Sequence, residues 1–419
     1  MSIEAKLADF SVKSRPSADA LAMMRLSLMD WAACGIAGRD EPLAVILRDK
    51  GIAEGGKAEA SVIGGGKLPA PRAALINGAI SHALDYDDTH FAHIGHTSVG
   101  VIPAVLAVAE RVGASFDDFL AACLIGSEGA VRVGIWLGRD HYQIGYHQTA
   151  TAGAFGACLG ALRLLGANET QAIAGIGLVS TKAAGLKTQF GTMGKPLNAG
   201  LAAEAGVEAA LWAMAGLTST ETGLQAFGAT HHGVADEVAL EGLGETWRML
   251  GVSHKFHACC HGLHAMLEAL SEVSVDPSHI ASVEITTHPR WITVCNKPTP
   301  QTGLEAKFSY SQTAAMALMG VDTSAIASFS DEVAKRADLV GLRGQVAVVA
   351  DGSLSEMQAR VRVTLIDGSV VKVAHDLASP MTLEVRAAKL QRKARGLVED
   401  ADALWNVAEL ADLTALLRA

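Results

Sequence analysis

The stretch ALAMMRLSLMDWAACGIAG, residues 20–38, decides how the first part of the chain folds. Leu21, Met24 and Leu28 recur at the spacing of one helix face, and two glycines near the end of the stretch signal a stop. Similar segments follow at 69–85, 97–113, 116–134, 148–165, 168–185, 198–215 and 219–227. Their many Gly and Ala residues permit helices to approach closely, so we predict an all-helical domain over residues 1–252.

A different pattern begins after about residue 250. Residues 359–376, ARVRVTLIDGSVVKVAHD, alternate with a period of two, and the Asp367-Gly368 pair in the middle is a hairpin signal. ASVEITTHP at 281–289 alternates in the same way. We therefore expect strands here, joined into a small antiparallel sheet.

Helical composition also occurs in this second part, near 305–319 and 330–345, and it returns after residue 381. Mixed with the expected strands, these helices predict an α+β domain over 253–385. A helical segment is expected over 386–419. The predicted fold class is thus α+β, with one large all-helical domain.

Composition narrows the functional class. The 419 residues are 50% hydrophobic and 19% charged, which excludes a mainly disordered chain. The net charge of −10 repels nucleic acid and anionic lipid, so neither is an expected partner. No apolar run is long enough to be expected to span a bilayer, and the N-terminus lacks the order of a signal peptide. Six cysteines in a chain of this length fit a reducing compartment, so we expect a cytoplasmic protein.

Chemically useful side chains concentrate in two short segments. SHALDYDDTHFAHIGHTSVG (81–100) and SHKFHACCHGLHAML (253–267) together hold eight of the fifteen histidines. Tyr146, His147 and Lys195 lie between these segments. Each residue alone has an ordinary structural explanation, such as a helix cap, a core histidine or a surface lysine. Their concentration favours a functional site.

Metal and nucleotide sites are weaker interpretations. Two sets of histidines resemble metal ligands: His90, His93 and His96, and His257, His261 and His264. The chain has no HExxH motif and no CxxC pair, so we expect no metal. GGGK at 64–67 lacks the spacing of a phosphate loop, and no GxGxxG follows a strand. We therefore expect no cofactor.

Histidine and lysine together suit proton removal from a carbon beside a carboxylate. Histidine moves protons near neutral pH, and lysine neutralises the negative charge that develops on the substrate. A chain of net negative charge that gathers these residues is consistent with a locally positive pocket for a small polycarboxylate.

Four landmarks carry a family resemblance. LDYDDTH…HTS, GYHQTATAGAFGA, KPLNAG and HKFHACCHGLHA resemble, in this order, the landmarks of the MmgE/PrpD family. That family includes 2-methylcitrate dehydratases, cis-aconitate decarboxylases and iminodisuccinate epimerase. The resemblance covers most of the chain. It implies a helical domain, an α+β lid, a last helical segment that returns to the first domain, a homodimer, and a cofactor-independent enzyme acting on small di- or tricarboxylates.

The resemblance also implies site residues. We take four residues as catalytic: Asp85, His96, His147 and Lys195. We take five as substrate-binding: Thr89, Tyr146, Lys255, His261 and His264. Either His147 or His96 is the expected base.

Departures from the family's pattern bear on the reaction. One extra residue lies between Thr89 and His96, and Asn198 stands where many relatives have His. Against the family's pattern, Gln312 replaces a Tyr of the decarboxylases and of many dehydratases, and Cys260 replaces a His of the decarboxylases. These differences weigh against a decarboxylase. The leading interpretation is a lyase of the 2-methylcitrate dehydratase type, and the close alternative is an epimerase of a dicarboxylate such as iminodisuccinate. A metal-dependent hydrolase and a non-catalytic binding protein are further alternatives.

Overall fold

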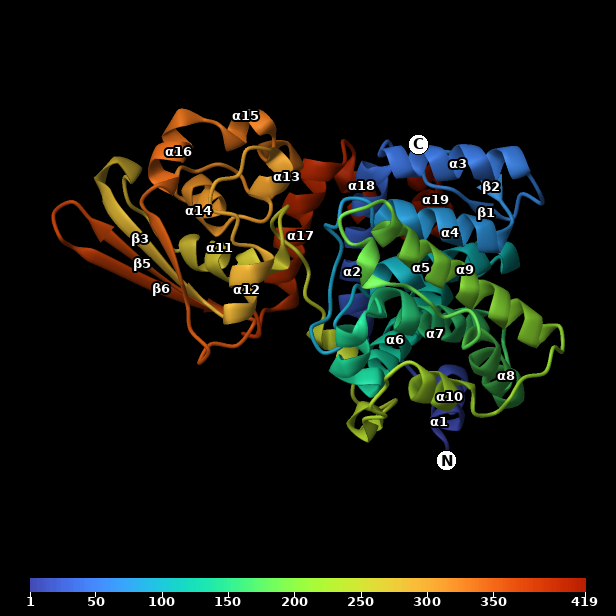
Figure 1. Ribbon diagram of the computed structural model, residues 1–419. Coiled ribbons are helices and arrows are strands. Elements are labelled where there is room, and N and C mark those ends of the chain that lie inside the picture. The colour runs from blue at the N-terminus through green and yellow to red at the C-terminus, as the bar shows by residue number, and fades with distance from the viewer. The chain divides into compact units, whose positions relative to one another are not determined.

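The computed structural model describes all residues, 1–419, and they divide into two compact units. The first unit contains Met1–His254 and Val398–Ala419, and the second contains Lys255–Leu397 (Figure 1).

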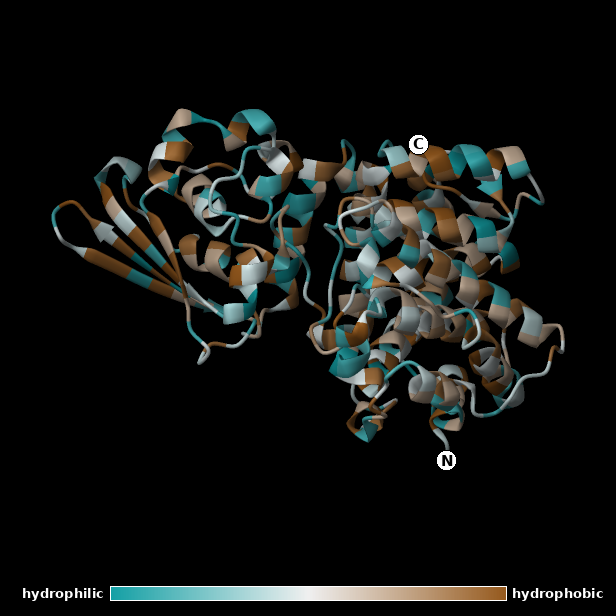
Figure 2. Cartoon of the chain, in the orientation of Figure 1, coloured by the Kyte–Doolittle hydropathy of each residue, from teal (hydrophilic) through white to brown (hydrophobic).

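The first unit is built almost entirely from helices. Their bounds are α1 Ile3–Lys13, α2 Ala18–Gly38, α3 Pro42–Glu54, α4 Ala70–Ser81, α5 Ser98–Val112, α6 Phe116–Ile144, α7 Gln148–Leu164, α8 Glu169–Val179, α9 Gly194–Met214, α10 Gly223–Thr230, α18 Ala401–Trp405 and α19 Leu410–Arg418. Each segment predicted to be helical before residue 250 overlaps one of these helices, and α1 and α3 were not predicted. Figure 2 shows apolar residues on most of them.

Small residues allow the central helices to pack closely. A Cβ on Gly156 of α7 would lie 2.5 Å from the carbonyl oxygen of Gly126 on α6. A Cβ on Gly78 of α4 would lie 2.9 Å from the Cα of Gly200 on α9. No side chain fits at such separations, so glycine is required where these backbones cross. The predicted close approach of helices is confirmed.

A short hairpin interrupts the helices of the first unit, so the expectation that it is purely helical is wrong. Strands β1, Ala60–Ser61, and β2, Lys67–Leu68, pair in antiparallel fashion. The glycines of the GGGK stretch form the turn between them, and Gly64, Gly65 and Gly66 all have positive φ. That stretch therefore serves as a hairpin turn.

The second unit combines a sheet with short helices. Its strands are β3 Ile280–Thr287, β4 Val346–Ala350, β5 Gln358–Leu365 and β6 Val370–Asp376. Its helices are α11 His264–Leu270, α12 Pro289–Val294, α13 Gly303–Ala306, α14 Tyr310–Leu318, α15 Asp331–Ala334, α16 Ala337–Arg343 and α17 Leu383–Leu397. The helices predicted near 305–319 and 330–345 are each divided into two short ones.

The sheet is mixed and not antiparallel as predicted. Its strand order is β4-β3-β5-β6. The β5–β6 hairpin forms as its sequence predicts, with Gly368 at φ 87° in the turn. Strand β4 was not predicted, and it pairs with β3 in parallel, with Val283 opposite Val346. A short apolar run cannot be assigned as a strand from periodicity alone, and the distant partner sets its direction.

The boundary between the units lies at His254 and Lys255, against a predicted change at 252 to 253. Residues 386–397, predicted to belong to the last segment, group with the second unit as most of α17, so that segment begins at Val398. Helices α18 and α19 then pack on α2 within the first unit. Arg25 of α2 donates to the carbonyl oxygen of Val407 at 2.6 Å.

Two helices of the first unit, α2 and α6, are long and apolar enough to cross a membrane by length and composition alone. However, 78% of the apolar window in α2 and 89% of that in α6 are buried inside the structure. They occupy the positions of core helices.

Candidate functional site

The loop between α4 and α5 gathers three aspartates and four histidines: Asp85, Asp87, Asp88, His82, His90, His93 and His96. Two of its residues adopt positive φ without being glycine: Asp85 at 51° and Ile94 at 57°. A β-branched residue such as Ile pays a steric cost there, so the surrounding contacts hold the loop in a strained conformation. A bridge between Thr89 and Ser253 ties the loop to the chain just before His254.

Asp87 lies at the centre of this loop, fully buried between two histidine rings. His82 Nδ1 is 2.8 Å from Asp87 Oδ1, and His96 Nδ1 is 2.7 Å from Oδ2. Burial alone would raise the pKa of Asp87, but charge and hydrogen bonds from the two histidines hold it well below its usual range. Asp87 is therefore an ionised, buried carboxylate.

Asp85 and Lys195 bring a second charged pair to the same place. Lys195 Nζ lies 2.7 Å from Asp85 Oδ1, and His96 Nε2 lies 3.3 Å from the same oxygen. Lys195 sits in the first turn of α9, with its side chain 16% exposed. Three of the four predicted catalytic residues thus lie together in the first unit.

His147, the fourth, precedes α7 as its N-cap residue. Its ring stacks at 6.3 Å from that of His82 and meets Phe190 edge-on at 4.9 Å, and Lys195 lies 5.4 Å from the same Phe190 ring. Burial and then the charges of His82, Lys195 and His96 hold the pKa of His147 well below its usual range. His147 is therefore a neutral imidazole.

Asn198 identifies which nitrogen of His147 carries hydrogen. The Asn198 amide nitrogen donates to the Leu186 carbonyl at 3.3 Å, and a carbonyl oxygen only accepts. The same amide nitrogen lies 3.2 Å from His147 Nδ1, which must then be the acceptor. The neutral ring consequently carries its hydrogen on Nε2.

Several polar residues of the same loop have structural roles. Asp88 accepts from the Ser98 backbone N–H and hydroxyl at the start of α5, and burial raises its pKa to about 7. His90 uses both ring nitrogens, with the Arg248 carbonyl and the His93 N–H. His93 is buried without a hydrogen-bond partner on either nitrogen, and burial lowers its pKa to about 3. These groups support the loop.

Tyr146 and Thr89, the predicted substrate-binding residues of the first unit, make contacts other than those of the ionic cluster, by which we mean His82, Asp85, Asp87, His96 and Lys195. The ring of Tyr146 stacks on His141 at 4.5 Å and lies 5.0 Å from His231. Tyr146 therefore belongs to a different aromatic group from that of His147. Thr89 is held by backbone hydrogen bonds to Ser253.

The remaining predicted residues form a cluster in the second unit. Lys255 and His264 are buried, and the rings of His261 and His264 lie 4.6 Å apart. Burial and then neighbouring positive charges, those of His261, His257 and Lys255, hold the pKa of His264 well below its usual range. Glu268 is paired with His257 and with Lys389, and its pKa falls to about 2 although burial opposes this. This cluster brings histidine rings and a buried lysine together in the second unit.

Other sequence positions of interest have clear packing roles in this unit. Gln312 is buried and accepts from Arg343 at 2.8 Å, and the hydroxyl of Tyr310 donates to the Gly262 carbonyl at 2.6 Å. Cys260 hydrogen-bonds to the buried Cys295, which raises the pKa of the Cys295 thiol. None of the six cysteines forms a disulfide bond.

One set of side chains has the composition of a metal site. Donor atoms of His82, Asp85, Asp87 and His96 all lie within 4.8 Å of one another. The Lys195 ammonium already contacts Asp85 Oδ1, and it would repel a bound cation. The set therefore fits a metal ion poorly. Of the histidine triads named from the sequence, only His96 belongs to it.

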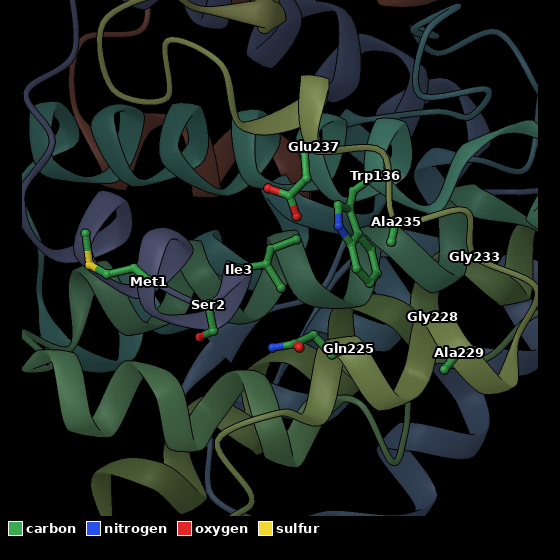
Figure 3. Close-up of a pocket in the computed structure, with 10 residues that line it drawn as sticks. All are labelled: Met1, Ser2, Ile3, Trp136, Gln225, Gly228, Ala229, Gly233, Ala235 and Glu237. Carbon is green, nitrogen blue, oxygen red and sulfur yellow. The ribbon is translucent and has the colours of Figure 1, made fainter.

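A cavity of about 390 Å³ lies elsewhere in the first unit (Figure 3). Met1, Ile3, Trp136, Gln225 and Glu237 are among the residues that line it. No predicted site residue lines this cavity. Its lining residues include none of the residues of the ionic cluster.

Asp87, His82 and Asn198 were not predicted as site residues, although the first two lie in the segment singled out from the sequence. A usable signal was present: two histidines flank an acidic run at 82–96. The pairing itself depends on the strained loop, which no spacing rule describes.

Comparisons with known proteins agree with this architecture. The MmgE/PrpD N-terminal domain matches residues 3–236, and the MmgE/PrpD C-terminal domain matches residues 257–413. The cis-aconitate decarboxylase-like protein oryM of Aspergillus oryzae is 30% identical over 299 residues, which are 65% of this chain and 61% of that protein. The cis-aconitate decarboxylase of Aspergillus terreus is 28% identical over 274 residues, covering 61% of this chain and 56% of its own length.

The human cis-aconitate decarboxylase is 31% identical over 157 residues, 36% of this chain and 32% of the human protein. The matched regions thus span less than two thirds of these relatives' length. Two domain matches that together extend over most of the sequence establish that the chain belongs to the MmgE/PrpD family.

Proposed function

We propose that the protein is a lyase that removes a proton from the carbon beside a carboxylate of a small di- or tricarboxylic acid. The observation that carries this proposal is the pairing of Lys195 with His96 through one carboxylate oxygen of Asp85. An ammonium and an imidazole that converge on a carboxylate are also the groups that would bind a substrate carboxylate. The family membership and the names of the relatives support a lyase.

His96 is the group best placed to take the proton. Its Nδ1 is engaged by Asp87, so Nε2 is the nitrogen that exchanges a proton with a ligand, once Nε2 has released any hydrogen that it shares with Asp85 Oδ1, 3.3 Å away. Removing the substrate proton gives an imidazolium between two carboxylates and leaves an enolate on the substrate. Lys195 stabilises the negative charge of that enolate.

His147 takes a different part in this proposal. Because its neutral ring carries hydrogen on Nε2, it donates a hydrogen bond to an oxygen of the enolate. It has no unprotonated nitrogen available on that side. Of the two histidines left open as the base, His96 therefore fits and His147 does not.

A single proton-transferring histidine favours a lyase over an epimerase. An epimerase that exchanges protons on two faces of one carbon needs a second base, and His147 does not supply one. A lyase needs a single group, since the proton taken by His96 can be returned to the departing hydroxyl group. The bond between the carbon and that hydroxyl breaks, a carbon–carbon double bond forms, and water leaves.

A decarboxylase is the second candidate, and the names of the relatives favour it. In that reaction a carbon–carbon bond breaks, carbon dioxide leaves, and the imidazolium of His96 protonates the resulting carbanion. Against the family's pattern, Gln312 and Cys260 stand in place of a Tyr and a His expected in the decarboxylases, and this weighs against a decarboxylase of the relatives' type. Lys255, His261 and His264 remain predicted substrate contacts.

Proton NMR in D2O distinguishes these reactions. The enzyme is incubated with 2-methylcitrate, citrate, cis-aconitate, citramalate, malate and iminodisuccinate. The proposal predicts a new vinyl or methine signal from water loss or addition with one hydroxy acid. Loss of carbon dioxide from cis-aconitate would establish the decarboxylase, and deuterium entry without net conversion would establish the epimerase. No change with any compound would contradict the proposed substrate class.

A further inference from the structure

Asp87 is the most enclosed charged group of the cluster. Its side chain has no solvent exposure, and its two oxygens each meet the Nδ1 atom of a different histidine. The rings of His82 and His96 lie 4.4 Å apart, edge to face. One carboxylate thus holds two imidazoles in a fixed arrangement.

The chemistry of this contact determines the tautomer of both rings. A carboxylate has only acceptor atoms, so each Nδ1 that faces it must carry a hydrogen. The Nε2 atom of each ring is then the one that can gain or lose a proton. For His96 this atom lies 3.3 Å from Asp85 Oδ1, next to Lys195, so it takes a substrate proton only after releasing any hydrogen that it shares with Asp85.

His82 completes the arrangement without reaching the ion pair. Its ring is buried and its Nε2 has no hydrogen-bond partner. It lies between His96 and His147, with ring centres 4.4 Å and 6.3 Å away. Its contact with Asp87 satisfies the second oxygen, which would otherwise be a buried acceptor without a donor.

We propose that Asp87 is a positioning residue that fixes His82 and His96 as a pair with hydrogen on both Nδ1 atoms, so that Nε2 of His96 is the nitrogen that exchanges the substrate proton. His82 is the second positioning residue, because it holds the far oxygen of Asp87 and thereby the carboxylate's orientation. The role of His96 Nε2 in catalysis rests on the proposed function. The assignment of hydrogen to both Nδ1 atoms stands without it.

The substitution Asp87→Asn provides a sharp test because it preserves the shape of the side chain but not the pair of acceptors. The introduced amide would present one acceptor and one donor, so it could satisfy both histidines only if one ring moved its hydrogen from Nδ1 to Nε2. Asp88→Asn is the matched control: it changes the neighbouring buried carboxyl, which contacts Ser98 instead of a histidine.

Long-range ¹H–¹⁵N NMR of the full chain labelled at histidine reports the tautomers directly. The His82→Gln and His96→Gln variants assign the two rings by removing their signals. We expect hydrogen on both Nδ1 atoms in the parent protein and in Asp88→Asn, and loss of hydrogen from one Nδ1 in Asp87→Asn. Hydrogen absent from either Nδ1 in the parent protein would overturn the proposal, even if Asp87→Asn failed to fold.

Kinetics separate positioning from stability. A wrong histidine tautomer lowers kcat by about 10²- to 10⁴-fold in comparable dyads, and we expect a loss in that range for Asp87→Asn with KM changed less than about threefold. Unchanged kcat in a folded Asp87→Asn variant would contradict the role. If no substrate turns over in the parent protein, the proposed function fails while the tautomer result still decides the proposal.

Discussion

The side-chain amide of Asn198 donates to both the Leu186 carbonyl and Nδ1 of His147, and this makes His147 a hydrogen-bond donor at Nε2. The ring is neutral because burial and the positive charges around it lower its pKa. Neutral imidazole that donates to a developing oxyanion stabilises it without an initial proton transfer.

The first prediction concerns the role of His147. A glutamine at this position keeps an N–H donor, whereas alanine keeps none, so we expect His147→Gln to retain at least about tenfold more kcat than His147→Ala. Steady-state kinetics on both variants, with circular dichroism to check folding, measures this. Equal and complete loss in both would instead indicate that the imidazole itself moves a proton. His279→Gln, an exposed histidine in the second unit, is the control.

The second prediction concerns the ammonium of Lys195. Lys195→Ala should lower kcat/KM by about 10²- to 10³-fold, because the charge that stabilises the enolate is removed. Lys195→Arg keeps the charge but not the position, and we expect an intermediate loss. Lys182→Ala, which removes a lysine paired with Glu208 in the same unit, should leave kcat/KM within about twofold. Activity unaffected in Lys195→Ala would exclude this lysine from the site.

A third prediction follows from the buried carboxyl of Asp88. Burial raises its pKa from the usual value of 3.8 to about 7, so the folded state disfavours its ionised form. Protonated Asp88 contributes fully to the free energy of unfolding below pH 3.8. This contribution is lost as the pH rises toward 7. By pH 8 the loss is on the order of 4 kcal/mol.

Asp88→Asn removes this titration, since an amide does not ionise. Urea unfolding of parent and variant at pH 5 and pH 8 should show the variant gaining relative stability at the higher pH, by about 2 to 3 kcal/mol. A difference between the two proteins that does not change with pH would show that Asp88 titrates normally.

The fourth prediction concerns the packing behind the strained loop. A Cβ at Gly134 of α6 would lie 2.0 Å from Nδ1 of the buried His93 ring. Gly134→Ala should therefore destabilise the protein by about 1 to 3 kcal/mol and displace the loop. Gly153→Ala is the matched substitution, since its nearest atom is 3.8 Å away. Chemical unfolding of both variants tests this, and equal stability would show that His93 moves at no cost.

The helices and the β5–β6 hairpin were predictable because the sequence signals that specify them lie close together in the chain. Apolar spacing in α2 and the Asp-Gly turn between β5 and β6 are each contained in fewer than thirty residues. Strand β4 was missed because it becomes a strand by pairing in parallel with β3, more than fifty residues earlier. Nothing within VAVVA itself indicates that partner.

The candidate site was predictable in residue type but not in contacts. The segment 81–100 and Lys195 were identified from chemistry and resemblance, and the structure brings Asp85, His96 and Lys195 together. Tyr146, next to His147 in the sequence, was predicted to bind substrate. The chain is extended at His147, with φ −96° and ψ 98°, so neighbouring side chains point to opposite sides.

The most direct test of the account is deuterium exchange at the carbon beside the substrate carboxylate, followed by NMR in D2O. It is measured for the parent protein, His96→Gln and His279→Gln with the compound identified from the panel. The account predicts rapid exchange or turnover in the parent and in His279→Gln, and a loss of at least about 10³-fold in His96→Gln. Exchange in His96→Gln at the parent rate would contradict the central claim that this histidine removes the substrate proton.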